Sequence, residues 1–285
     1  MSDKNKKASV IKITAVIIVI AILVGILILL IPVEKRNSEI KTYGKAMYEL
    51  SLTDSRVRYI IDNPNEYPDY FISYIKKTVI SSDYDEEEKE DIINWVYNYP
   101  FHYNDNKTMS FTDDEINSDK VPALYMSDFR WSYETIGNSY IKDDGCMTVA
   151  ITMAYLYLTK KTDINPAIIA SMAEQIEDMG ILSGIGADSS KKICEQIGLN
   201  VVEYKFDGEN DKADLQLIKD IIDSGHVVLV GASGEVFGDH AIIIRDYDDN
   251  GNVYINDPSE KRNTEKTWVF DDISAEILYV WDLSF

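Results

Sequence analysis

The sequence predicts an α+β domain in which N-terminal helices pack on an antiparallel sheet, preceded by a single transmembrane helix and a helical prelude. Three observations predict this order. Residues 13–31 form a run without a charge, residues 37–120 show helical and tyrosine-rich patterns, and residues 121–285 show helical patterns followed by strand patterns. The expected parts are therefore a tail with a membrane anchor (1–36), a helical prelude (37–120) and the α+β domain (121–285).

The composition is that of a folded and strongly acidic protein. Of the 285 residues, 45% are apolar and 27% are charged, and the formal net charge is −21. A chain of this charge repels the phosphate backbone, and the sequence shows no basic patch to oppose that repulsion. Nucleic acid is therefore excluded as a partner.

The uncharged run ITAVIIVIAILVGILILLI at 13–31 is the predicted transmembrane helix. As a helix it is about 28 Å long, close to the thickness of a hydrocarbon core. A cleaved signal peptide is the alternative, but its apolar region is usually about 7–15 residues long, and the run leads directly into PVEKR at 32–36 without a small-residue cleavage site. We expect an uncleaved signal anchor. The lysines before the span favour a cytoplasmic N-terminus, which places residues 37–285 outside the cytoplasm.

Two helices are expected in the prelude. The segment EYPDYFISYIKKTVI (66–80) carries apolar residues at four-residue spacing, namely Phe71, Ile75 and Val79. The segment DEEEKEDIINWVYNY (85–99) opens with acidic residues, which complement the positive end of a helix dipole, and closes on an apolar face. The polar segment at 103–120 predicts a boundary.

The remaining chain changes from helical to strand patterns. Helices are expected at 146–158, 165–175, 189–197 and 213–223, and strands at 226–232, 240–247, 252–257 and 276–283. The segment DDNG (248–251) predicts a hairpin turn. Its aspartates also suggest calcium, but the other ligands of a known calcium loop are missing. No metal and no cofactor is predicted.

The candidate chemistry rests on few residues. The chain has three histidines, His102, His226 and His240, and two cysteines, Cys146 and Cys194. Two cysteines could pair in an oxidising space, but they do not form a disulfide framework. We expect Cys194 to be a packed helix residue, His102 to be solvated or to cap a helix, and His240 to be either a strand-end residue or a base.

The predicted hairpin provides a geometric test for His240. If the loop has four residues, Asp257 lies on the face of His240, opposite Ile242 and diagonal to His240. Diagonal neighbours lie about 7–8 Å apart at the backbone, within reach of their side chains. A carboxylate that contacts an imidazole fixes its tautomer and stabilises the imidazolium. A bulge in either strand would reverse this parity.

Cys146 is predicted to begin a helix, where the partial positive charge favours a thiolate. A nearby His240 would favour the thiolate further. A helix with cysteine, then a strand with histidine, then a strand with a carboxylate is the chain order of papain-like cysteine hydrolases. The alternative is that Cys146 is a small buried apolar residue, because buried free cysteine is common.

Over most of residues 57–285 the chain resembles the bacteriocin-processing (double-glycine leader peptidase) family thirty-nine of the papain-like cysteine peptidases, in its secreted or membrane-anchored stand-alone type. The segment DFRWSYETIGNSYIKDDGC (128–146) is similar to the approach to the nucleophile in that family. The segment GDHAIIIRDYDDNGNVYINDP (238–258) resembles the block that carries its histidine and aspartate. The resemblance implies a papain-like fold with Cys146 as nucleophile, His240 as general base, Asp257 as orienting carboxylate and the Cys146 backbone N–H as one oxyanion donor.

The sequence departs from this family at several positions. Met126 aligns with a glutamine whose side-chain amide helps to hold the oxyanion, and a thioether cannot donate a hydrogen bond. Met147, Thr148 and Val149 replace the usual residues after the cysteine, and Asp239 replaces the usual glycine before the histidine. Loss of one oxyanion donor typically costs about 10²–10³ in rate, so Met126 predicts reduced activity.

The sequence thus favours a membrane-anchored, extracytoplasmic thiol hydrolase that acts on a peptide or protein by a Cys-His-Asp triad. The alternative is a non-catalytic module on the same fold that binds a peptide or a cell-wall component. A structural surface protein that self-associates through its prelude is the third hypothesis. The sequence does not indicate the substrate or the oligomeric state.

Overall fold

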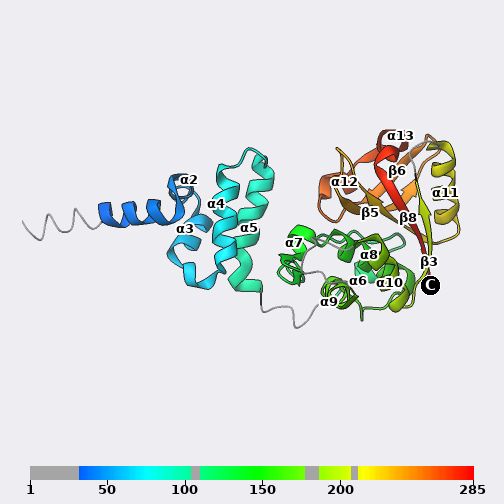
Figure 1. Cartoon of the computed structure of the whole chain (residues 1–285), viewed down its shortest axis with the longest axis horizontal. Coiled ribbons are helices and arrows are strands. Elements are labelled where there is room, and N and C mark those ends of the chain that lie inside the picture. The colour runs from blue at the N-terminus through cyan, green and yellow to red at the C-terminus, as the bar shows by residue number, and fades with distance from the viewer. Residues whose placement is uncertain (1–31, 104–109, 177–185, 207–210) are drawn as a thin grey trace, which may run out of the picture. The chain divides into compact units, whose positions relative to one another are not determined.

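The computed structural model describes residues 32–103, 110–176, 186–206 and 211–285 (Figure 1). The chain divides into two compact units, of which the first ends at Pro100 and the second begins at Phe101. Each unit has a core of its own, and the residues of the candidate site all belong to the second unit.

In its described residues the first unit is helical. Its elements are a helix at 32–43, α2 (Lys45–Leu50), α3 (Ser55–Asp62), a 3-10 turn (Pro64–Glu66), α4 (Asp69–Ile80) and α5 (Glu86–His102). The helices predicted at 66–80 and 85–99 are thus confirmed. Phe71 and Ile75 are buried as expected, but Thr78 rather than Val79 completes the buried face of α4. The Phe71 ring lies 4.8 Å from that of Trp95.

The second unit begins with a helical half. Its elements are α6 (Asp113–Ile116), a ribbon of β1 (Thr135–Ile136) and β2 (Ser139–Tyr140), α7 (Ile141–Asp144), α8 (Cys146–Thr159), α9 (Pro166–Ile176) and α10 (Ala187–Gln196). The three long helices confirm the prediction to within one or two residues. Every residue of α8 from Met147 to Leu156 is buried, so α8 is the central helix of this half.

The sheet half follows. Its six strands are β3 (Asn200–Lys205), β4 (Val227–Ala232), β5 (His240–Tyr247), β6 (Asn252–Asn256), β7 (Thr267–Val269) and β8 (Ile277–Ser284). They lie in the order β3-β8-β4-β5-β6-β7, and every pair is antiparallel. The four predicted strands are present, whereas β3 and β7 were not predicted.

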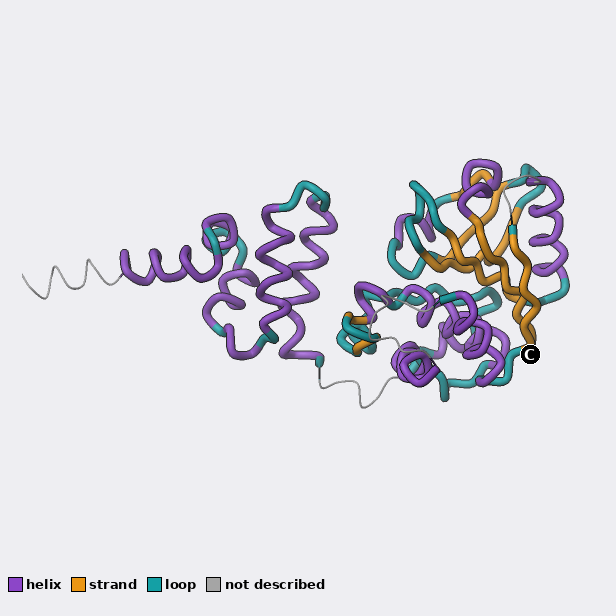
Figure 2. Tube along the Cα trace, viewed as in Figure 1, coloured by secondary structure: helices purple, strands orange, loops and turns teal. Residues whose placement is uncertain are grey.

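The sheet is covered on both faces (Figure 2). Helices α8 and α10 pack on one face, where Leu229 and Ile243 join their core, and α9 packs on these two helices. Helices α11 (Asp211–Asp223) and α13 (Phe270–Ile273) pack on the other face, which is lined by alternating residues such as Val230 and Ile244. This alternation follows from the two-residue period of a strand. The mixed helical and antiparallel architecture expected from the sequence is confirmed.

The predicted transmembrane span at 13–31 lies outside the described residues. None of the helices in the described ranges combines the length and the apolar character that crossing a bilayer requires.

Candidate functional site

Cys146 is the first residue of α8, at the point where this buried helix emerges from the core. Its side chain is half-buried, whereas the ten residues that follow it are buried. The first N–H groups of a helix have no partner within that helix, and the positive end of its dipole lies there. The structure thus presents a thiol at the N-terminal end of a buried helix.

Gly145 allows α7 to pass directly into α8. A Cβ atom at this position would lie 2.5 Å from the carbonyl oxygen of Ile141 and 2.8 Å from its Cα atom. Such contacts do not occur in proteins, so any larger residue would push the two helices apart. The Gly145 N–H donates to the Ile141 carbonyl at 2.9 Å, and the Thr148 hydroxyl donates to the Gly145 carbonyl at 2.7 Å. The position of Cys146 is therefore fixed by its immediate neighbours.

His240 is the first residue of β5, and the loop before it is held by Glu276. The Glu276 carboxylate accepts the backbone N–H groups of Val236 at 2.8 Å and of Phe237 at 3.1 Å. Gly234 lies so close to this carboxylate that a Cβ atom would be 2.2 Å from its carbon. This loop, from Ser233 to Asp239, thus brings the chain to His240 along a fixed path.

His240 and Asp257 are in direct contact. His240 Nε2 lies 2.7 Å from Asp257 Oδ1, and only 9% of the histidine side chain and 2% of the aspartate side chain are exposed. Asp257 Oδ1 also accepts the backbone N–H groups of Ser259 at 2.8 Å and of Glu260 at 3.1 Å. Because a carboxylate only accepts, Nε2 carries the proton, and Nδ1 is left for Cys146, with which the ring also forms a hydrogen bond.

The electrostatics of the three groups favour an imidazolium. Burial acts to lower the pKa of His240, but hydrogen bonds to Asp257 and Cys146, together with their negative charges, outweigh burial and raise this pKa to about 10. Burial likewise acts to raise the pKa of Asp257, whereas the hydrogen bond and charge of His240 hold it below its ordinary value. The pair is therefore charged over the whole physiological pH range.

The register that brings Asp257 to His240 differs from the predicted hairpin near its turn. Tyr247 pairs with Val253, so the loop has five residues, and a bulge at Arg245 adds one residue to β5. Beyond the bulge, Ile243 pairs with Asn256, and the next step places Asp257 opposite Ile242. The predicted parity is correct at the site because the odd loop and the bulge cancel each other.

Met126, the predicted oxyanion position, is a buried residue with a fixed neighbourhood. It is 4% exposed and belongs to the core cluster against which Cys146 packs. Its N–H donates to the Pro258 carbonyl at 2.8 Å, and its Sδ accepts the Ser259 hydroxyl at 3.0 Å. Met126 therefore lies against the segment that follows Asp257.

The remaining cysteine and histidines lie outside this cluster. Cys194 is a free thiol on α10 that packs into the core and is 1% exposed, and burial raises its pKa to about 12. Cys146 is also a free thiol, so the two cysteines are not paired. The ring of His102 stacks on that of Phe129 at 4.7 Å. His226 Nδ1 lies 2.7 Å from Asp282 Oδ1, which ties the start of β4 to β8.

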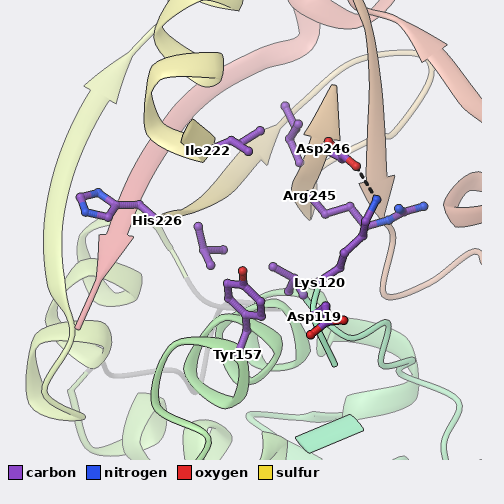
Figure 3. A pocket seen from close by; sticks show the side chains of 10 residues that line it. Asp119, Lys120, Tyr157, Ile222, His226, Arg245 and Asp246 are labelled. Atoms are coloured by element: carbon purple, nitrogen blue, oxygen red, sulfur yellow. Dashed lines mark hydrogen bonds and ion pairs between the residues drawn. The ribbon is translucent and has the colours of Figure 1, made fainter. Parts of the chain in front are cut away.

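A separate cavity of about 180 Å³ lies at the far end of α8 and β5 (Figure 3). The Tyr157 hydroxyl points into it, and Lys120 reaches across one side to form an ion pair with Asp246. Tyr157 is eleven residues after Cys146 on α8, or about 16 Å along the helix axis. None of the residues that line this cavity belongs to the Cys-His-Asp cluster.

The cluster thus combines a thiol at a helix N-terminus, a charged imidazole and a buried carboxylate. This arrangement can generate a thiolate and then return a proton to a leaving group. Sequence reasoning did not identify the residues that hold the cluster in place, namely Glu276, Ser259, Asn263 and Thr264. Three of these follow Asp257 within seven residues, but none lies in a pattern that indicates a role.

Comparison with known proteins gives a match to one family model and a weak match to a solved structure. The sequence profile described as the Peptidase_C39 like family matches residues 118–283. The crystal structure of the peptidase domain of Streptococcus ComA, described as a bi-functional ABC transporter involved in a quorum-sensing pathway, is 12% identical with a TM-score of 0.39. The match covers 53% of this chain and 98% of that domain. No curated protein sequence matches the chain.

Proposed function

Because the chain belongs to the Peptidase_C39 like family, we propose that it is a cysteine peptidase that cleaves a peptide or protein with Cys146, His240 and Asp257 as its triad. The observation that carries this proposal is the contact of a buried imidazole with Asp257 on one side and Cys146 on the other. A strongly bound carboxylate behind a base that contacts a thiol is the arrangement expected of an activated nucleophile.

In the proposed resting state the Cys146 proton already lies on His240 Nδ1, so that a thiolate faces an imidazolium. The thiolate attacks the peptide carbonyl carbon, and the backbone N–H of Cys146 donates to the oxygen on which negative charge develops. The imidazolium then gives its proton to the leaving amine as the C–N bond breaks. Water gives a proton to the now neutral His240 and attacks the resulting thioester, and the departing Cys146 thiolate restores the pair with the imidazolium. Asp257 holds the ring in the tautomer that both proton transfers require.

We further propose that acylation is slow in this protein because Met126 cannot donate to the oxyanion. The Met126 thioether accepts a hydrogen bond from the Ser259 hydroxyl and has no hydrogen to donate. The backbone N–H of Met126 is already bonded to the Pro258 carbonyl. Thiolate formation does not depend on Met126, because the imidazole and the helix dipole supply it. We therefore expect Cys146 to react rapidly with a small alkylating agent while the protein hydrolyses peptides slowly.

Alkylation of the folded, reduced protein tests this proposal. Iodoacetamide near neutral pH should label Cys146 rapidly and leave Cys194 unlabelled. A buried thiol with a pKa of about 12 is ionised in about one molecule in 10⁵ at pH 7, and only the thiolate reacts. Peptide mapping by mass spectrometry identifies the labelled cysteine, and hydrolysis of a fluorogenic peptide library gives the turnover.

Denaturation provides the internal control, because both cysteines should then be labelled. Failure of Cys146 to react in the folded, reduced protein would contradict a catalytic thiol and would favour the non-catalytic binding module. Fast labelling together with fast hydrolysis would support the cysteine peptidase but would contradict the proposal that Met126 slows acylation.

The location of the enzyme is part of the proposal. We expect residues 13–31 to anchor the chain and the residues after 37 to face away from the cytoplasm, as the uncharged run and the lysines before it predict. Protease added to intact cells should then remove the folded part, as followed by an antibody to the C-terminus. If the folded part were completely protected from the protease, it would face the cytoplasm and the predicted topology would be wrong. A shortened chain in the medium would indicate a cleaved signal.

A further inference from the structure

The short helix α12 (Lys261–Glu265) holds Asp257 by two adjacent residues. The Asn263 side-chain amide donates from Nδ2 to Asp257 Oδ2 at 2.8 Å. The Asp257 backbone N–H donates to the Thr264 hydroxyl at 2.9 Å. One residue of α12 thus fixes the carboxylate, and the next fixes the backbone that carries it.

The two oxygens of Asp257 have different partners. Oδ1 accepts from His240, Ser259 and Glu260, and each of these donors meets the same oxygen. Oδ2 accepts from Asn263. Because Asp257 is 2% exposed, its second oxygen depends on protein donors rather than on bulk water. Asn263 therefore sets the plane of the carboxylate and stabilises its ionised form.

The chemistry of the amide suits this role. A lysine or arginine at the same place would form its own ion pair with Asp257 and compete with His240 for the negative charge. A neutral amide donates a hydrogen bond and leaves the full charge of the carboxylate in place. The imidazole is then the one charged group that contacts Asp257 among the interactions the structure shows for this side chain.

Helix α12 is itself anchored to the sheet. Trp268 on β7 donates its indole N–H to the Asn263 carbonyl at 3.1 Å. Arg245 on β5 donates to the Thr264 carbonyl at 3.1 Å and to the Ile255 carbonyl at 3.3 Å. Asn263 thus approaches Asp257 from a helix that is tied to β5, the strand that begins with His240, and to β7.

We propose that Asn263 is a positioning residue of the site, whose side-chain amide keeps Asp257 oriented and ionised so that Oδ1 meets His240. This inference rests on the proposed function, because it gives Asn263 a part in that reaction. The titratable residues that contact the pair are Cys146 on α8 and Glu260, which reaches Asp257 through its backbone N–H. The exposed carboxylate of Asp239 accepts the Ser233 hydroxyl.

Substitution of Asn263 tests the inference by its effect on pH dependence. Asn263→Ala should lower peptide hydrolysis about 10-fold, since it removes a hydrogen bond to a charged group. It should also move the acid limb of activity to higher pH, because loss of a donor to the ionised form raises the pKa of Asp257. Lys261→Ala, an exposed change on the same helix, should alter neither.

A readout without substrate separates this inference from the proposed function. With only three histidines in the chain, the His240 Nε2–H proton can be assigned by NMR. In the native protein this signal should persist until Asp257 is protonated at low pH, and in Asn263→Ala it should be lost at higher pH. If no peptide is cleaved, the peptidase proposal fails while the NMR titration still decides the role of Asn263.

Asn263→Asp keeps the size of the side chain and covers the case in which the alanine variant does not fold. A second carboxylate beside Asp257 Oδ2 makes one of the two easier to protonate, so the acid limb and the loss of the Nε2–H signal should move up in pH. The inference would be overturned if the folded variants matched the native protein in three quantities. These are the acid limb of activity, the rate of peptide hydrolysis and the pH at which the His240 Nε2–H signal is lost.

Discussion

Replacement of Cys146 by serine should abolish peptide hydrolysis, with a loss on the order of 10⁴-fold or more. The reaction depends on a thiolate paired with His240, and a serine hydroxyl in the same place is far less acidic than a thiol. The fold should survive, because serine is close to cysteine in size and Cys146 is half-buried at the start of α8 rather than within it. The measurement is kcat/KM on any peptide that the native protein cleaves, together with a thermal unfolding curve.

Cys194→Ala is the matched control. Cys194 lies on α10 with its side chain packed in the buried core, outside the Cys-His-Asp cluster, so its loss should leave kcat/KM within about twofold and lower the free energy of unfolding slightly. Cys146→Ser with native activity would reject the thiol mechanism. An equal loss in both variants would mean that the effect arises from the fold.

The chain order of the candidate site could be predicted from sequence because each residue of the proposed triad lies in an element with a clear signal. Cys146 follows a glycine and begins an apolar run of helical length. His240 begins an apolar strand, and a strong turn joins that strand to the next one, which leads to Asp257. The buried helix α8 contacts β5, which brings the first residue of each together. Local patterns therefore placed the three residues in elements that the structure brings together, but they left open whether Cys146 and His240 are ordinary packed residues.

The details of the hairpin could not be predicted from the same signals. A four-residue loop and a five-residue loop with a bulge give the same register at Asp257, and the sequence around Arg245 contains no glycine that would indicate a bulge. The position of Arg245 in the bulge is nevertheless important, because its guanidinium is bonded to the carbonyl groups of Ile255 and Thr264. The prediction was correct at the site for a reason that the sequence did not reveal.

The supporting elements carry no sequence signal at all. Helix α12 has the sequence KRNTE, which contains no apolar residue and is too short to show a periodicity. Strand β3 was missed because its sequence, NVVEYK, lies between two helical patterns and pairs with the last strand of the chain. Contacts of this kind depend on distant partners, so they follow from the assembled fold rather than from local composition.

Asp257→Asn should lower kcat by up to about 10⁴-fold and shift the alkaline limb of activity to lower pH. The amide is close in size to the carboxylate, so the ring can stay in place, but the negative charge that stabilises the imidazolium is lost. The pKa of His240, about 10 in the native protein, should then fall toward its ordinary value of 6.5. The imidazolium that protonates the leaving amine is therefore lost at a lower pH.

The same change has a defined effect on stability. The raised pKa of His240 contributes stability that is fully present below about pH 6.5 and is lost as the pH rises toward 10, and the lowered pKa of Asp257 contributes stability that is lost in acid. The difference in free energy of unfolding between the native protein and Asp257→Asn should thus be largest between about pH 4 and 6.5 and should narrow toward pH 10. Denaturant unfolding at several pH values measures it.

Asp239→Asn is the matched control for both measurements. It makes the same chemical change one residue before His240, but Asp239 is exposed and its carboxylate accepts from Ser233 rather than from the ring. We expect its activity to stay within a few-fold of the native value and its alkaline limb to remain near pH 10. If Asp257→Asn is no more affected than Asp239→Asn, the buried carboxylate does not orient His240, and the triad reduces to a cysteine and a histidine.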